Sequence, residues 1–248
     1  MSRSMRTLVL DWGNTSLKYG AFEGVHLTDS GRFADPTLVD LEPWIRGQKV
    51  EHVVAASTGQ TPEPFLRNLQ GRYTVFLIDA HTQVPLNMGY STPETLGVDR
   101  KAVAVAAAMD YPEEWSMVID CGTCITYDLV APGQRYVGGA ISPGLAMRLK
   151  AMSAFTARLP HVELRSDTFR WPGQSTNDSL WTGALKGWQL EISGYVNETR
   201  QEHPELNIIL TGGDAPYFES TEKLGIFADP FYVLRGLNAI YGHHARTK

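Results

Sequence analysis

The stretch Asp11-Trp12-Gly13-Asn14-Thr15-Ser16-Leu17-Lys18 decides the predicted fold, because it joins two strand-like runs through a tight turn. The apolar run before it ends in a carboxylate, and residues 17–22 are typical of a returning strand. Such a turn presents backbone N–H groups and polar side chains that can surround phosphate oxygens, and its glycine allows a close approach of the backbone. The stretch therefore predicts a phosphate-binding hairpin. An ordinary hairpin with a Gly-Asn turn is the alternative.

A second stretch of the same kind, Asp120-Cys121-Gly122-Thr123, follows the apolar run 115–119 and precedes the strand-like run 125–130. Two carboxylate-tipped turns of one pattern are most simply explained by an internal duplication. We therefore expect an α/β protein of two related domains, 1–105 and 106–248, each with a mixed sheet flanked by helices. A nucleotide would bind in the cleft between them.

Hydrophobic periodicity and turn residues predict the individual elements. The expected strands cover 7–11, 17–22, 25–33, 50–55, 73–78, 115–120, 125–130, 136–141 and 206–210. The expected helices cover 37–46, 62–70, 99–109, 145–152, 176–201 and 231–244.

A third turn, Thr211-Gly212-Gly213-Asp214, comes directly after the strand-like run 206–210. A strand, two glycines and a helix start would let a flat ring lie against the backbone, and adenosine fits that description. A plain strand-to-helix turn is the alternative.

The composition excludes several classes of partner. Of the 248 residues, 43% are apolar and 20% are charged, and the net charge is -5 without a long run of either sign. Binding to nucleic acid or to an anionic membrane needs clustered Lys and Arg, so neither is expected as a partner. No apolar run approaches the roughly 20 residues of a membrane span, and the N-terminal residues show no signal-peptide pattern, so we expect a cytoplasmic location.

The two cysteines, Cys121 and Cys124, form a C-x-x-C pair. A zinc site would need two more ligands, and a redox pair usually opens a helix, whereas these residues span an apparent turn between strands. We interpret them as small residues beside a phosphate-binding loop.

The order of the three turns resembles the acetate kinase, sugar kinase and actin superfamily, whose domains are ribonuclease H-like. More narrowly, four pieces across nearly the whole chain resemble the type III pantothenate kinases: 11–15, Gly97-Val98-Asp99-Arg100, 120–123 and Gly138-Gly139-Ala140-Ile141-Ser142-Pro143-Gly144. The resemblance implies phosphorylation of pantothenate by ATP, the first step of coenzyme A biosynthesis. It also implies a homodimer, Mg²⁺, and a monovalent cation, K⁺ or NH₄⁺.

The resemblance assigns roles to the first hairpin and to the substrate site. Residues Asp11 to Lys18 would contact the ATP phosphates, with Asp11 holding Mg²⁺ through water. Gly97, Val98, Asp99 and Arg100 would line the pantothenate site, with Asp99 as the catalytic base. A carboxylate can accept the hydroxyl proton, and the planar fork of Arg100 suits the pantothenate carboxylate. A helix-start Asp beside a solvated Arg is the alternative for this pair.

The resemblance also assigns ligand-binding roles to four residues outside these two segments. Tyr90 corresponds to a substrate-contacting tyrosine, and Thr176 to a substrate-binding threonine near the dimer interface, with a helix N-cap as the alternative. Asp120 would ligate the monovalent cation, and Thr123 would contact ATP.

Three departures from the family pattern concern the size of side chains. Trp12 replaces a smaller aliphatic residue, Ser175 replaces a common Asn, and Cys121 and Cys124 replace small aliphatic residues. Two other functions stay open at this point: a kinase of another small hydroxylated substrate, and a nucleotide-binding regulator without catalysis.

Overall fold

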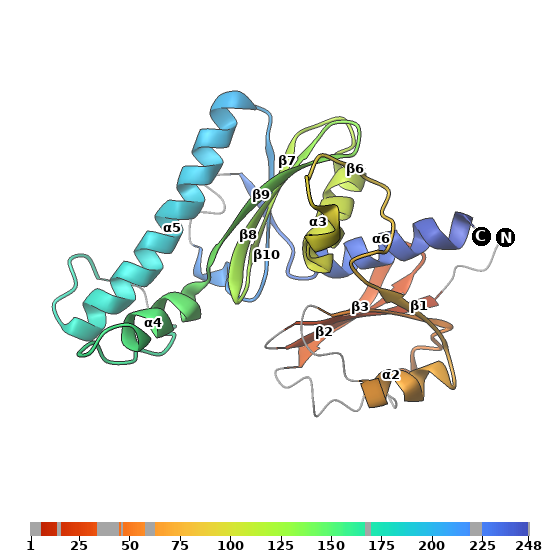
Figure 1. Ribbon diagram of the computed structural model, residues 1–248, viewed down its shortest axis with the longest axis horizontal. Coiled ribbons are helices and arrows are strands. Elements are labelled where there is room, and N and C mark those ends of the chain that lie inside the picture. The colour runs from red at the N-terminus through yellow and green to blue at the C-terminus, as the bar shows by residue number, and fades with distance from the viewer. Residues whose placement is uncertain are drawn as a thin grey trace. The chain divides into compact units, whose positions relative to one another are not determined.

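The computed structural model describes residues 6–13, 16–33, 45, 47–57, 63–166, 170–218 and 225–247 (Figure 1). The chain divides into two compact units. The first consists of Met1–Glu113, Asp128–Gly138 and Phe231–Lys248, and the second of Glu114–Tyr127 and Gly139–Pro230. Apart from Ile45, the expected helix 37–46 lies outside the described residues.

The first unit contains a five-stranded mixed sheet in the order β3-β2-β1-β4-β5. Its strands are β1 (Arg6–Trp12), β2 (Leu17–Glu23), β3 (His26–Phe33), β4 (His52–Ser57) and β5 (Thr74–Ile78). The hairpin strands β1, β2 and β3 pair antiparallel, whereas β1, β4 and β5 pair parallel. Parallel strands place their carboxyl ends at one edge, so the ends of β1, β4 and β5 lie together.

The sheet of the first unit is covered on both faces, which explains why β1 is a nearly continuous apolar run. On the face toward α2 (Glu63–Gln70), Leu8, Leu10 and Trp12 belong to one hydrophobic cluster with Leu66 and Leu69. Figure 1 shows α2 on one side of this sheet and α6 (Tyr232–Thr247) on the other.

The helix α6 packs against α3 (Val98–Asp110) and contacts β1, β2 and β4. At one end of α6, the Tyr232 hydroxyl donates to Oδ2 of Asp110 over 2.9 Å. Farther along, Nδ2 of Asn238 donates to the Gly24 carbonyl oxygen, also over 2.9 Å. The last helix of the sequence therefore completes the core of the unit that begins with the first strand.

A six-stranded sheet has the order β11-β10-β7-β8-β9-β6. Its strands are β6 (Asn87–Met88), β7 (Ser116–Cys121), β8 (Cys124–Ala131), β9 (Arg135–Pro143), β10 (Asn207–Thr211) and β11 (Ile226–Ala228). In the second unit, β7, β10 and β11 pair parallel, so the carboxyl ends of β7 and β10 lie side by side.

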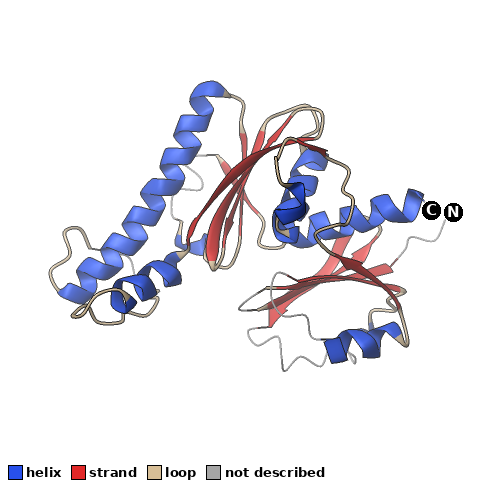
Figure 2. Ribbon diagram, viewed as in Figure 1, coloured by secondary structure: helices blue, strands red, loops and turns tan. Residues whose placement is uncertain are grey.

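Two helices belong to the second unit and pack against each other: α4 (Leu145–Ala154) and α5 (Thr176–Glu202) (Figure 2). The hydroxyl of Ser175 caps α5 by accepting from the Asp178 amide over 3.1 Å, which satisfies one of the first free N–H groups of the helix. Trp181 and Trp188 are fully buried along one side of α5 and supply much of its packing area.

The predicted mixed α/β architecture, with two mixed sheets flanked by helices, is confirmed. The short strands β6 and β11 were not expected from the sequence. The helix expected after Gly213 is a single 3₁₀ turn, Ala215–Tyr217. The duplication and the division at residue 105 stay predictions. Among the described residues, no helix is both long and apolar enough to cross a bilayer.

Candidate active site

The first predicted hairpin is formed by β1 and β2 of the first unit, with Asp11 paired opposite Lys18. The amide of Gly13 donates to the carbonyl of Ser16 over 3.0 Å and closes the turn. Asn14 and Thr15 lie outside the described residues. The side chain of Leu17 is completely buried in the core, so this residue can offer a ligand only its backbone.

A cavity of about 510 Å³ lies in the first unit where β1, β4 and β5 end. Trp12 forms part of its wall, and the other wall holds three predicted substrate-site residues, Gly97, Val98 and Asp99. The structure thus brings the end of the first hairpin strand and the start of α3 to one cavity. Most of its lining is apolar, and the carboxylates of Asp79, Glu94 and Asp99 are its charged groups.

Asp99 occupies the first turn of α3, where the positive end of the helix dipole favours a carboxylate. Its Oδ1 atom accepts from the Arg100 amide over 2.9 Å, and the side chain is half-buried. The same oxygen sits where a Cβ atom on Gly97 would be, so the glycine makes room for this orientation of the carboxylate.

Arg100 is buried, and its guanidinium is held by two residues that the sequence did not single out. Its Nε atom donates to Oδ1 of Asp128 over 2.8 Å, and its Nη2 atom donates to the Tyr136 hydroxyl over 2.9 Å. The Tyr136 hydroxyl in turn donates to Oδ1 of Asp128 over 2.8 Å. The expectation of a solvated Arg beside Asp99 is therefore wrong, because this side chain is 7% exposed and ion-paired.

The surroundings of Arg100 and Tyr136 shift the pKa values of both side chains upward. Burial opposes the charge of Arg100, but Asp128, Tyr136 and Tyr90 outweigh it and raise the pKa of the guanidinium. Burial and the Asp128 carboxylate raise the pKa of Tyr136 far above its ordinary value, so its hydroxyl remains a donor. The cluster therefore combines a guanidinium that stays charged with a phenol that stays neutral.

Tyr90, another predicted substrate residue, joins the same cluster. Its ring centroid lies 6.0 Å from Cζ of Arg100 and 5.9 Å from the ring centroid of Tyr136. The first contact is at the outer limit of a cation–π interaction. The structure therefore brings Tyr90 and Arg100 together.

In the second unit, the turns at Asp120 and Gly212 meet. The amide of Asp214 donates to the Cys121 carbonyl over 2.8 Å, and Gly212 has a φ of +97°, which favours glycine. A Cβ atom on Gly212 would overlap Oδ1 of Asp120 and the Cys121 carbonyl. The two predicted ligand turns are thus adjacent, and Gly213 is exposed beside them.

The segment ending in Gly144 reaches the same turn. The amide of Gly144 donates to the Thr123 carbonyl over 3.2 Å, and a Cβ atom on Gly144 would overlap the carbonyl oxygen of Gly122. Thr123 itself is exposed, whereas Cys121 is buried and burial raises the pKa of its thiol well above the ordinary value. Cys121 therefore stays a neutral thiol and packs as a small apolar residue.

Thr176 is exposed and forms the first residue of α5. The alternative that Thr176 is the N-cap is wrong, because Ser175 makes that contact. Within the second unit, Thr176 is thus free of a capping role.

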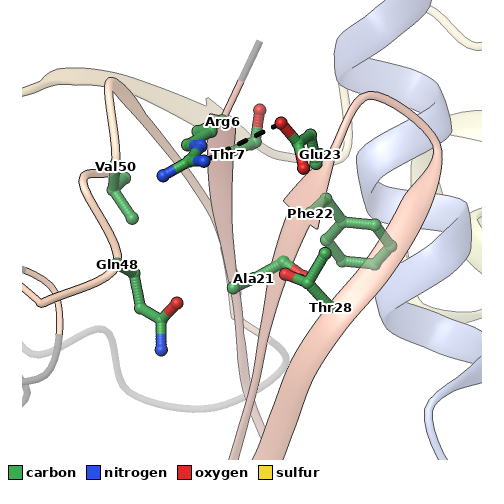
Figure 3. Close-up of a pocket in the computed structure, with 8 residues that line it drawn as sticks. All are labelled: Arg6, Thr7, Ala21, Phe22, Glu23, Thr28, Gln48 and Val50. Atoms are coloured by element: carbon green, nitrogen blue, oxygen red, sulfur yellow. Dashed lines mark hydrogen bonds and ion pairs between the residues drawn. The ribbon is translucent and has the colours of Figure 1, made fainter. Parts of the chain in front are cut away.

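A smaller cavity of about 170 Å³ lies in the first unit around Arg6 and Gln48 (Figure 3). Arg6 and Glu23 form an ion pair of 3.8 Å at its edge. None of the predicted site residues lines this cavity. In the described ranges, no cluster of three or more His, Cys, Asp or Glu side chains has the arrangement of a metal site.

Comparison with known families shows to which family the chain belongs. A family model described as type III pantothenate kinase matches residues 7–198. A type III pantothenate kinase from Bacteroides fragilis is 40% identical over 240 residues, which cover 96% of this chain and 98% of the relative. The chain belongs to the type III pantothenate kinase family. Of the predicted site residues, Gly212 and Gly213 lie beyond the matched range of this type III pantothenate kinase model.

Solved structures of low sequence identity share the type III pantothenate kinase fold. A protein from Campylobacter jejuni, named a Baf family transcriptional activator, has a TM-score of 0.59 at 21% identity and covers 96% of this chain and 99% of its own. A ROK hexokinase from Thermus thermophilus has a TM-score of 0.50 at 17% identity, with 98% and 100% covered. These likenesses support the ribonuclease H-like, actin-like fold class predicted from the sequence.

Proposed function

We propose that this chain transfers the γ-phosphoryl group of ATP to the primary hydroxyl of pantothenate, forming 4'-phosphopantothenate in the first step of coenzyme A biosynthesis. The observation that carries the proposal is the position of Asp99. It lies in the wall of a cavity of about 510 Å³, beside a buried arginine, in a chain of the type III pantothenate kinase family. A cavity of this size is in the range that holds a small organic substrate.

In the proposed reaction, the acceptor hydroxyl oxygen bonds to the γ-phosphorus while the bond from that phosphorus to the β,γ-bridging oxygen breaks. Asp99 accepts the hydroxyl proton, and ADP leaves with the electrons of the broken bond. Such a reaction depends on positioning and on neutralising charge rather than on covalent chemistry by the protein. The contact of Asp99 with the Arg100 amide holds the carboxylate in one orientation.

For the nucleotide, we propose the first hairpin and the turns of the second unit. Asp11, Trp12, Gly13, Asn14, Thr15, Ser16, Leu17 and Lys18 would bind phosphates, with Thr123, Gly212 and Gly213 as further contacts. The meeting of the Asp120 and Gly212 turns in the second unit supports this proposal.

The cation requirement is also proposed. Mg²⁺ and K⁺ or NH₄⁺ prefer oxygen ligands, and the Asp11 and Asp120 carboxylates end buried strands, as such ligands should. Asp11 would hold Mg²⁺ through water and Asp120 the monovalent cation. The divalent ion would neutralise the charge of the transferred phosphoryl group.

We further propose a cytoplasmic homodimer, in which α5 supplies the interface and Thr176 reaches the partner's substrate site. Large apolar side chains are exposed on and near α4 and α5: Met147 37%, Phe155 89%, Trp171 78%, Leu190 58% and Tyr195 39%. Exposed aromatic and apolar groups in one region are typical of an interaction surface.

An ADP-release assay with pantothenate, ATP, Mg²⁺ and K⁺ tests the proposal. We expect turnover with pantothenate and little with neutral sugars. Turnover with another acceptor alone would favour a different kinase on this fold. ATP binding without any turnover, with K⁺ present, would favour a catalytically inactive nucleotide-binding regulator.

A further inference from the structure

The cluster of Arg100, Asp128 and Tyr136 joins three separate elements of the first unit. Arg100 lies in the first turn of α3, Asp128 in β8 and Tyr136 in β9. The exposed fractions of the three residues are 6%, 0% and 0%. Buried polar side chains that satisfy one another fix a single arrangement, because any other arrangement leaves a buried group without a partner.

The three hydrogen bonds also decide which side of the guanidinium is engaged. The single hydrogen of Nε and one hydrogen of Nη2 point along the same edge, and these donate to Asp128 and Tyr136. Among the residues that the structure describes, these two are the hydrogen-bond partners of the guanidinium. The other edge, formed by Nη1 and the second hydrogen of Nη2, is the one left to donate two parallel hydrogen bonds.

The position of that second edge matters because Arg100 follows Asp99 directly. The Arg100 amide donates to Oδ1 of Asp99 over 2.9 Å, so one peptide unit links the carboxylate to the arginine. The backbone of Arg100 is bonded to Asp99, and its guanidinium is bonded to Asp128 and Tyr136. Together these contacts restrict the distance between the second edge of the guanidinium and Asp99.

We propose that Asp128 and Tyr136 are positioning residues that hold Arg100 so that its Nη1–Nη2 edge binds the carboxylate of an acidic acceptor. The inference rests on the proposed function and deepens it, because it names the residues that position the substrate-binding arginine. The carboxylate occupies the arginine fork while the hydroxyl at the other end reaches Asp99. Asp128 and Tyr136 act through Arg100 and do not touch the acceptor.

The geometry explains why a pair of residues is used. Asp128 supplies the negative charge that stabilises the buried Arg100. Its Oδ1 atom accepts from Nε, and the Tyr136 hydroxyl accepts from Nη2, the other donor on the same edge of the guanidinium. Because the phenol donates to the same Oδ1 atom that Nε contacts, the three groups form a closed ring of hydrogen bonds.

The test compares an acidic acceptor with its neutral counterpart. Pantothenate and pantothenol differ in having a carboxylate or a hydroxymethyl group at the end far from the phosphorylated hydroxyl. KM and kcat for pantothenate, and the inhibition constant of pantothenol against it, are measured for the full chain and for Tyr136→Phe and Asp128→Asn. Tyr136→Phe keeps the ring and removes one hydroxyl, so it is the variant that preserves packing best.

We expect Tyr136→Phe to raise KM for pantothenate about three- to tenfold, the effect of losing one ordinary hydrogen bond, with kcat changed less than about twofold. The affinity for pantothenol should stay within about twofold of that of the parent, because it has no carboxylate to place. Asp128→Asn should act in the same direction and more strongly. A purely structural role would weaken both ligands equally.

The matched control is Tyr127→Phe, which removes another buried phenol hydroxyl that donates to a carboxylate, that of Glu191, over 2.9 Å. It should leave the preference for pantothenate over pantothenol unchanged. If Asp128→Asn does not fold, Tyr136→Phe decides alone. Equal losses for both ligands, or an unchanged KM for pantothenate, overturn the inference, whereas a parent protein without turnover of pantothenate overturns the proposed function.

Discussion

Gly236 in α6 lies directly against Ala102 in α3, so closely that a Cβ atom on the glycine would overlap the carbonyl oxygen of Ala102. The two helices can approach this closely only because one of them has no side chain at the crossing. Since Asp99 and Arg100 lie in the first turn of α3, the crossing also fixes the helix that carries both residues.

Substitution of Gly236 by Ala should destabilise the protein, because backbone atoms of α3 cannot yield as a flexible side chain would. We expect a loss of about 1–3 kcal/mol in the free energy of unfolding, measured by denaturant titration. The control is Gly242→Ala on the same helix, where a Cβ atom would meet nothing within 4 Å. That change should stabilise by about 0.5–1 kcal/mol, so a loss of equal size in both variants would contradict the role of the crossing.

Substitution of Asp99 by Asn should lower kcat by about 10²–10⁴-fold, the range expected for removal of a general base. The amide keeps the shape of the carboxylate, so binding of ATP, measured by calorimetry, should be nearly unchanged. Wild-type turnover in this variant would show that another group takes the proton.

Substitution of Gly97 by Ala should displace the Asp99 carboxylate without unfolding the protein. The new Cβ atom would overlap Oδ1 of Asp99, whereas the φ of -54° at Gly97 suits alanine. We expect kcat to fall about 10- to 100-fold, as misplacement of a reacting group by about an ångström can do, with an unchanged melting temperature. Gly242→Ala, where a Cβ atom meets nothing within 4 Å, serves as the control and should keep full activity.

Acid should weaken the second unit through Glu191. Burial opposes the charge of this carboxylate, but hydrogen bonds from Arg148, Tyr127 and Ser142 outweigh it and lower its pKa below the ordinary 4.5. A carboxylate with a lowered folded-state pKa contributes stability that is complete above its unfolded pKa and is lost as the pH falls through the folded value.

Melting temperatures between pH 7 and pH 3 test this contribution with Glu191→Gln. The variant should be less stable than the parent at pH 7, and the difference should shrink as the pH falls below about 4.5. Glu198→Gln, an exposed position on the same helix, should follow the parent at every pH. A difference between Glu191→Gln and the parent that is independent of pH would exclude the carboxylate charge as its cause.

The proposed dimer predicts that Leu190→Asp yields a monomer. Leu190 is 58% exposed on α5, and a charge placed in a desolvated interface without a partner is costly. Light scattering after size-exclusion chromatography would measure the mass. Val25→Asp, at a 64% exposed position of the first unit, should stay a dimer. If the parent protein is already monomeric at micromolar concentration, the proposed homodimer is wrong.

Local patterns were sufficient for most of the fold. The carboxylate-tipped hairpin at Asp11, the strands β7 and β10, and the start of α5 at Thr176 follow from apolar runs and turn residues close together in sequence. The same patterns missed β6 and β11, because strands of two or three residues carry too few side chains to show a period.

Arg100 shows where sequence reasoning about the site reached its limit. The sequence shows that Arg100 is next to Asp99. Its hydrogen-bond partners, Asp128 and Tyr136, lie about 30 positions farther along, in strands on either side of a turn. One signal was present: Asp128 is the charged residue of the mostly apolar strand β8, and a buried carboxylate needs a cationic partner. The sequence offered no way to tell which of many arginines and lysines that partner is.

The sequence by itself determined most of the elements and the family, because these depend on residue patterns within short segments. The tertiary structure alone decided which turns meet, that α6 completes the unit begun by β1, and that Arg100 is held by Asp128 and Tyr136. The physical reason is that burial and hydrogen-bond partners are properties of packing between distant segments, which local propensity does not encode.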